Sequence, residues 1–216
     1  MGCTSSDAHG HGGIFKLKRP APEEGITHAG PWVKKVSDIT GFPVFPEEYK
    51  QSLLSKALNK DVWEQCKGKS DAKGVSFETC ILSGVQNVDS GIGCYAGSHD
   101  SYTTFAPLFD QVIEMYHKHG KDGKHISNMN ASELNCPEFP ADEAAMIVST
   151  RIRVGRNLAD YPLGPGITNE QRKEVLQRVT KAFESYTGDL AGNFYALTDL
   201  TSAQRKQLIE DHFLFK

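Results

Sequence analysis

The fold prediction rests on the stretch Met146-Ile147-Val148-Ser149-Thr150-Arg151-Ile152-Arg153-Val154-Gly155-Arg156-Asn157. Its β-branched and apolar residues predict a strand. Side chains alternate between the two faces of a strand, so Ser149, Arg151 and Arg153 are expected on one face. Two guanidiniums at this spacing can clamp a polyphosphate through paired N–H bonds. Alternatively, they can form salt bridges with carboxylates on a neighbouring strand, and the stretch alone leaves both interpretations open.

Length and charge bound the class of protein. The chain has 216 residues, which is long enough to bury a sizeable core. Its formal net charge of -3 gives no support to a nucleic-acid partner. No apolar run approaches the length of about 20 residues that a membrane span needs. Five scattered cysteines without a CxxC pair predict reduced thiols in a cytoplasmic chain, and we predict no metal site among its residues.

The first 25 residues are rich in Ser, Gly, His and Pro, which predicts a disordered tail. Gly2 and Ser6 fit the N-myristoylation pattern, and Cys3 is a candidate for palmitoylation. One acyl chain binds membranes only marginally, so a second acyl group or the basic cluster 16–19 would add needed affinity. The alternative is a chance match in a tail of small residues. We favour lipidation and a membrane-tethered chain, for example in a flagellum or cilium.

Helical periodicity dominates residues 26–128, which we predict to form a small all-helical domain. One helix is expected from Pro46 onward, with an apolar face at Leu53, Leu54, Ala57 and Leu58. A second helix is expected over 105–116, where an apolar stripe repeats at helical spacing in Phe105, Leu108, Phe109, Val112, Ile113 and Tyr116. Between them, residues 84–97 predict a Gly-punctuated loop whose backbone N–H groups can hold a small anion, although a plain turn is the simpler interpretation.

The polar residues 129–144 predict a linker, and residues 145–216 predict the beginning of a second domain. Capping boxes at 168–171 and 201–204 each predict a helix start. Residues 194–197 predict a short strand, and the apolar ending 211–216 is also strand-like. A strand needs neighbours, so we expect this sequence to be cut short.

Together these motifs resemble the phosphagen (ATP:guanidino) kinases, closest to arginine kinase and taurocyamine kinase. The resemblance covers residues 27–216 and is carried by the segments 148–158, 160–163, 187–192 and 211–215, together with the loop 84–95. It implies an α+β fold, in which a small all-helical N-terminal domain precedes the start of an antiparallel-sheet-plus-helices, glutamine-synthetase-like catalytic domain. It also implies reversible transfer of the ATP γ-phosphoryl group to a guanidino acceptor, with Mg²⁺ bound to ATP or ADP.

The resemblance assigns residues to two sites. Residues that match the nucleotide site are Ser149, Arg151, Arg153 and His212, which favours the phosphate clamp over the salt-bridge interpretation. Residues that match the guanidino-acceptor site are Ser90, Gly91, Ile92, Gly93 and Tyr95. The compact loop favours arginine as acceptor and taurocyamine next.

One part of the family pattern has no match here. The acidic pair that grips the guanidinium, the reactive cysteine and the remaining nucleotide-binding arginines correspond to segments after Lys216. We therefore predict no catalytic residue within these 216 residues and no activity from this chain alone. The alternative function is a catalytically inactive product that serves as a binding or dimerisation module, and a homodimer is among the expected assemblies.

Overall fold

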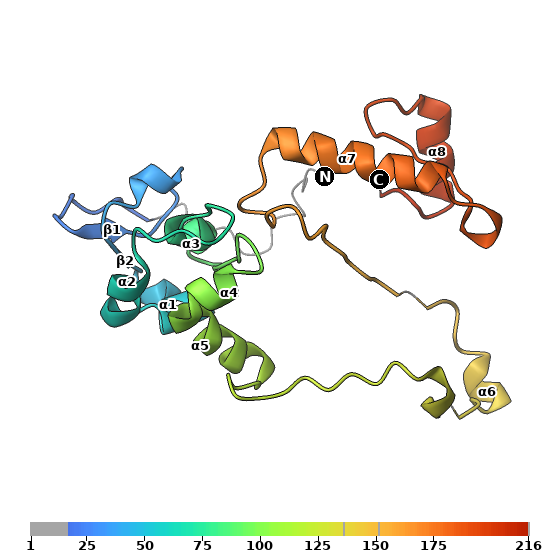
Figure 1. Cartoon of the computed structure of the whole chain (residues 1–216), viewed down its shortest axis with the longest axis horizontal. Coiled ribbons are helices and arrows are strands. Elements are labelled where there is room, and N and C mark those ends of the chain that lie inside the picture. Colours follow the sequence, from blue (N-terminus) through green and yellow to red (C-terminus); the bar gives the residue numbers. More distant parts are fainter. Residues whose placement is uncertain (1–16, 136, 151, 216) are drawn as a thin grey trace. The chain divides into compact units, whose positions relative to one another are not determined.

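The computed structural model describes residues 17–135, 137–150 and 152–215 (Figure 1). It divides into two compact units, which are described separately below, with the boundary in the chain between Ile167 and Thr168. The domain boundaries expected from the sequence stay a prediction. The lipidation residues Gly2 and Cys3 and the predicted clamp residue Arg151 lie outside the described residues.

The first unit contains a small parallel sheet that the sequence did not predict. Strand β1 (Ile26–His28) pairs with β2 (Phe42–Val44), with Thr27 opposite Pro43. The buried Thr27 hydroxyl accepts hydrogen bonds from the backbone N–H groups of Thr40 and Gly41, at 2.9 and 3.0 Å. The prediction of an all-helical domain is therefore wrong. Segments of three residues are too short for a period of two to be recognised in sequence.

Short helices make up most of the rest of this unit. They are η2 (Val36–Asp38), η3 (Glu47–Tyr49), α1 (Leu53–Ala57), α2 (Lys60–Cys66), α3 (Phe77–Gln86), α4 (Ser101–Thr104) and α5 (Ala106–His117). The helix predicted from Pro46 is wrong in its start, because η3 and a turn occupy 47–52 before α1 begins. Ser52 explains this start, since its hydroxyl accepts the N–H of Ser55 as an N-cap at 3.0 Å. The predicted helix over 105–116 is confirmed as α5.

The core of the unit gathers the apolar faces of these helices. A chain of aromatic contacts crosses it from Phe42 through Trp63 and Phe77 to Phe105, with ring centroids 6.4, 6.1 and 5.3 Å apart. Leu54 and Ala57 of α1 and Leu108, Phe109 and Val112 of α5 are also buried there. The apolar periodicity therefore identified most core positions of these two helices, whereas Leu53 and Ile113 are only partly buried and Tyr116 is 59% exposed.

Residues 118–157 lie mostly outside this core. They include the short helices η4 (Ala131–Glu133) and α6 (Ala141–Ala144), and nearly all of their described side chains are exposed. The predicted strand at 146–157 is wrong for its described residues, none of which is in a strand. Val148 is 98% exposed and Ile152 is 89% exposed. A strand is stabilised by hydrogen bonds to a neighbour, and no described residue pairs with this stretch.

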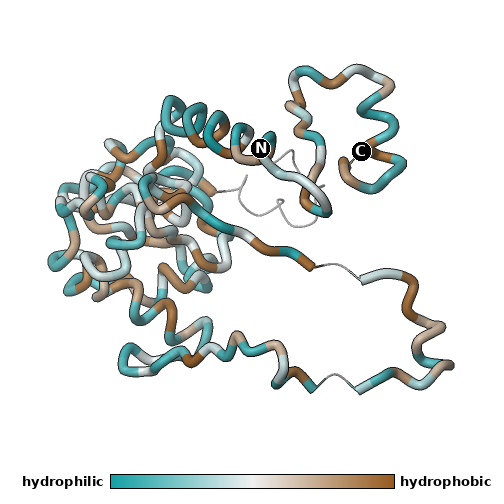
Figure 2. Tube along the Cα trace, turned by 45° about the vertical axis from the view of Figure 1, so that its right-hand side comes forward, coloured by the Kyte–Doolittle hydropathy of each residue, from teal (hydrophilic) through white to brown (hydrophobic). Residues whose placement is uncertain are grey.

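The second unit is built on α7 (Asn169–Glu184), followed by η5 (Gly188–Leu190) and α8 (Ser202–Glu210). Both predicted capping boxes are confirmed, with Thr168 and Gln171 capping α7 and Thr201 and Gln204 capping α8. Hydrophobic and hydrophilic residues alternate along the turns of α7 (Figure 2). None of the described residues of this unit is buried, and the strands predicted at 194–197 and 211–215 are absent among them. The antiparallel sheet of the predicted fold class therefore has no counterpart in the described parts of the chain.

Candidate functional site

The candidate site centres on the Gly-rich loop, defined here as residues 87–97. The predicted loop began at Gly84, but α3 extends through Gln86, so its first three residues are helical. The carbonyls of Gly91 and Ile92 accept the backbone N–H groups of Leu53 and Leu54, at 3.0 and 2.9 Å. These are the first two N–H groups of α1, which lack partners inside the helix. The loop and the start of α1 therefore satisfy each other's backbone and fix the loop in place.

Two glycines allow the Gly-rich loop to lie directly against α3. A Cβ placed on Gly84 would lie only 2.3 Å from the carbonyl oxygen of Gly93. Gly93 itself has φ +87°, in the left-handed region that favours glycine, and a Cβ placed on it would lie 3.0 Å from the Cβ of Leu54. The N–H of Tyr95 then donates to the carbonyl of Cys80, at 2.8 Å. The loop is thus held from both sides by backbone contacts that side chains would block.

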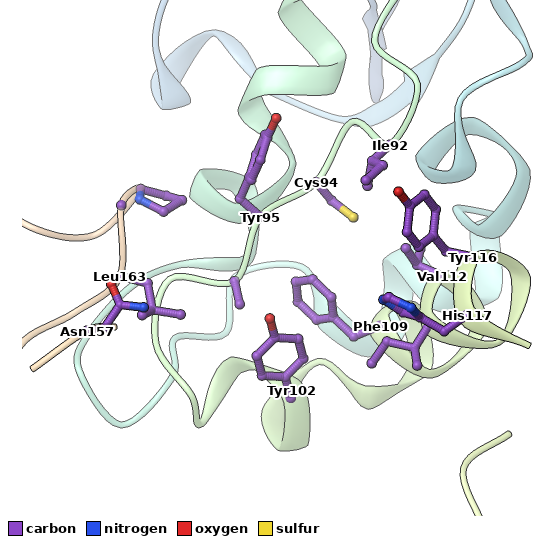
Figure 3. Close-up of a pocket in the computed structure, with 14 residues that line it drawn as sticks. Ile92, Cys94, Tyr95, Tyr102, Phe109, Val112, Tyr116, His117, Asn157 and Leu163 are labelled. Atoms are coloured by element: carbon purple, nitrogen blue, oxygen red, sulfur yellow. The ribbon is translucent and has the colours of Figure 1, made fainter. Parts of the chain in front are cut away.

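An apolar pocket of about 390 Å³ lies beside the loop. Figure 3 shows the Ile92 side chain and the Cys94 sulfur pointing toward α5, whereas the ring of Tyr95 points away from it. Phe109 and Val112 of α5 form part of the pocket wall. Burial raises the pKa of the Cys94 thiol to about 12, so this sulfur stays protonated and is no nucleophile at neutral pH.

The residues of the predicted acceptor site are neighbours in the chain and lie in the Gly-rich loop. Ser90 and Ile92 are partly buried, Gly93 is buried, and the Tyr95 side chain is 51% exposed. Gly91 is exposed, with nothing within 4 Å of the position that a Cβ would occupy.

The predicted nucleotide residues are divided between the two units. Ser149 and Arg153 are both exposed in the extended stretch of the first unit. His212 follows α8 in the second unit, is also exposed, and has the left-handed φ of 62°. Arg151 is outside the described residues. The geometry of the phosphate clamp therefore stays a prediction.

A buried carboxylate near the loop was missed by the sequence analysis. Asp71 is 6% exposed and accepts the hydroxyls of Ser98 and Ser101, at 2.8 and 2.5 Å. It also accepts the backbone N–H groups of Lys73 and Val75, at 2.9 and 3.0 Å. Burial raises its pKa, but these four hydrogen bonds outweigh burial and leave the pKa below the ordinary value. The sequence signal for part of this arrangement was the turn pattern Asp71-Ala72-Lys73-Gly74.

Two further features bear on ligands and membranes. Among the described residues, no group of three or more His, Cys, Asp or Glu side chains is arranged to hold a metal ion. No helix in the described parts of the chain combines the length and apolar character that crossing a bilayer requires.

Residues 48–114 match the family described as ATP:guanido phosphotransferase, N-terminal domain. The arginine kinase of Anthopleura japonica is 46% identical over 178 residues, which cover 80% of this chain and 25% of that protein. Arginine kinase Scy s 2 of Scylla serrata is 41% identical over 166 residues, which cover 77% of this chain and 47% of that protein. This chain belongs to the phosphagen kinase family and corresponds to its N-terminal portion.

Solved phosphagen kinases share its fold. The crystal structure of lombricine kinase is 30% identical with a TM-score of 0.65, covering 78% of this chain and 46% of that one. The duplicated taurocyamine kinase of Schistosoma mansoni, with bound components of a transition-state analogue, is 28% identical with a TM-score of 0.64. That comparison covers 79% of this chain and 24% of the solved one. The chain thus spans 24% to 47% of the length of these phosphagen kinases.

Proposed function

We propose that this chain is part of an enzyme that reversibly transfers the γ-phosphoryl group of ATP to a guanidino acceptor, with arginine favoured and taurocyamine next. The observation that carries the proposal is the Gly-rich loop, whose backbone is fixed against the start of α1 in a chain of this family. Such a reaction would buffer the ATP concentration of a cell.

The acceptor would bind at the Gly-rich loop. Ser90, Gly91, Ile92 and Gly93 would hold its carboxylate or amine end, with Tyr95 beside them. The hydrogen bonds from Leu53 and Leu54 restrain the peptide planes of this loop before any ligand arrives. Such preorganisation lowers the entropy cost of placing the acceptor nitrogen in line with the phosphoryl group.

The nucleotide would bind through Ser149, Arg151, Arg153 and His212. Phosphoryl transfer passes through a loose transition state, so positive charge on the phosphate oxygens matters more than covalent chemistry. The two arginines would supply part of that charge, and Mg²⁺ would arrive bound to ATP or ADP.

The finer fold class belongs to the same proposal. The catalytic domain would contain the antiparallel sheet with helices, glutamine-synthetase-like, that the resemblance implies. The carboxylates that orient the acceptor guanidinium would come from outside these residues. We therefore expect the 216-residue chain to bind acceptor weakly and to show no turnover alone.

A coupled assay tests this function. The chain, and a version extended along its reading frame, would each receive Mg-ATP with arginine, taurocyamine, creatine or glycocyamine. Turnover only in the longer version, highest with arginine, is the expected result. Absence of turnover in both folded proteins would instead favour the binding or dimerisation module, and size-exclusion chromatography would then test for a homodimer.

The N-terminus would tether the protein to a membrane. Myristoylation at Gly2, palmitoylation at Cys3 and the basic cluster 16–19 would together supply the affinity that one acyl chain lacks. A Gly2→Ala variant is expected to leave the membrane fraction of expressing cells. Unchanged membrane association of that variant would disprove acylation at this residue as the anchor.

A further inference from the structure

We propose that Asp71 is a positioning residue, which couples the Gly-rich loop to the docking of residues 158–166. The inference rests on the proposed function only where it concerns acceptor binding. The structural part stands on hydrogen bonds and close contacts within the first unit.

One oxygen of the Asp71 carboxylate fixes the backbone of Val75 by a hydrogen bond. Its Oδ1 accepts the N–H of Val75 at 3.0 Å, and the N–H of Asp71 donates to the Val75 carbonyl at 2.9 Å. The paired bonds fix the turn 71–75 and the position of the Val75 side chain. That side chain fills the space next to two glycines, because a Cβ on Gly97 or on Gly166 would lie 2.3 Å from one of its methyl groups.

The other oxygen is linked to the backbone of Gly97 by hydrogen bonds through Ser101. Oδ2 accepts the Ser101 hydroxyl at 2.5 Å, and the oxygen of that hydroxyl accepts the N–H groups of Gly97 and Ser98, both at 3.0 Å. Ser101 is fully buried, so water cannot replace these bonds. Asp71 therefore reaches Gly97 by two independent routes, through Val75 and through Ser101.

Gly97 joins two functional segments. It lies two residues after Tyr95, at the end of the Gly-rich loop. Its carbonyl accepts the N–H of Leu163 at 2.7 Å, and the Leu163 side chain packs on the core. In addition, the Lys73 ammonium, in the turn held by Asp71, donates to the carbonyl of Asp160 at 3.1 Å. The segment 158–166 follows directly on the arginine-containing stretch that is predicted to bind nucleotide.

A shift of Gly97 would thus move both the acceptor side and the connection to the nucleotide side. The carboxylate suits this role because its two oxygens accept four hydrogen bonds in fixed directions. Asparagine at position 71 has nearly the same size as aspartate. However, an NH₂ group replaces one carboxylate oxygen, and an NH₂ group in place of Oδ2 cannot accept hydrogen bonds from the two serine hydroxyls. The substitution Asp71→Asn therefore disturbs Gly97 with little change in volume.

The test uses the ¹⁵N-labelled 216-residue chain, with amide hydrogen exchange and arginine titration followed by NMR. Asp71→Asn and the milder Ser101→Ala are expected to speed exchange at Leu163 by about tenfold while amides in α5 keep their protection. They are also expected to weaken arginine binding by about tenfold, because small displacements of positioning groups have large effects.

Asp100→Asn is the matched control. Asp100 ties the same turn to α4, through the N–H of Ala72 at 2.8 Å and the hydroxyl of Thr104 at 2.9 Å, but its side chain makes no bond to Gly97. It should leave exchange at Leu163 and arginine binding within about twofold of the unmodified chain, the size expected for a local surface contact.

The outcomes separate this inference from the proposed function. Unchanged Leu163 exchange in a folded Asp71→Asn chain would overturn the positioning role, and so would equal acceleration throughout α5, since that is general destabilisation. Failure of arginine to shift the loop amides of the unmodified chain would overturn the acceptor site, while the exchange data would still decide the role of Asp71.

Discussion

Gly84 offers a test in which two physical effects oppose each other. Gly84 lies inside α3, where replacing glycine by alanine normally stabilises a helix by about 0.5–1 kcal/mol. Here the new Cβ would lie 2.3 Å from the Gly93 carbonyl oxygen, and real Cβ contacts are essentially never below 3.0 Å. The Gly-rich loop must therefore retreat, and forced overpacking of this kind costs about 1–3 kcal/mol.

We expect overpacking to win, because the opposing atom is backbone and is held in place by α1. Gly84→Ala should lower the free energy of unfolding of the first unit by about 1 kcal/mol, the difference between these two effects. It should also weaken arginine binding at the displaced loop. Urea denaturation followed by tryptophan fluorescence measures the stability, since both tryptophans, Trp32 and Trp63, lie in this unit.

Gly91→Ala provides the control within the same loop. Its Cβ would meet nothing within 4 Å, so its effect on stability should stay within about 0.5 kcal/mol. If Gly84→Ala were as stable as the unmodified chain or more stable, helix propensity would have won. The close packing of α3 against the loop would then be refuted.

Three further predictions concern the core, the pH dependence and the thiols. Phe105→Ala should destabilise the first unit by about 3–5 kcal/mol in the same denaturation experiment, because this fully buried ring packs 5.3 Å from Phe77. The lowered pKa of Asp71 contributes stability that is present above the ordinary carboxyl pKa and is lost as the pH falls through the pKa of the folded state. Acid titration of tryptophan fluorescence should show this loss of stability below about pH 4. The substitution Asp71→Asn should remove that part of the pH dependence. Cys66, Cys80 and Cys94 are buried with raised pKa values, so peptide mapping after iodoacetamide at pH 8 should find them unmodified in the folded chain and alkylated in urea.

Local features were predictable from the sequence where a few neighbouring residues decide the outcome. The capping boxes at Thr168 and Thr201 were predicted to the residue, because each needs only side chains three positions apart. The apolar stripe of α5 was predicted for a similar reason, since a helix of twelve residues is long enough to show its period. The short helices α2 and α3 were missed, and the pairing of β1 with β2 could not be seen in three-residue segments.

The candidate site was predicted in part. The Gly-rich loop was located from its glycines and from the resemblance to the family, but its attachment to α1 was not. The strand at 146–157 was predicted from its β-branched pattern and is absent among the described residues. The alternation of apolar and polar residues predicts which face of a strand would be apolar. A strand itself forms only when a neighbouring strand completes its backbone hydrogen bonds.

The sequence by itself therefore determined the family, the caps and the main apolar stripe, since these depend on residues close together in the chain. Only the tertiary structure decided that Asp71 meets Ser101, thirty positions away, and that Gly97 meets Leu163. It also decided that Gly84 packs directly against the backbone of Gly93, which leaves no room for a side chain on Gly84. Such contacts join segments that are distant in sequence, and their partners are chosen by the packing of the whole unit.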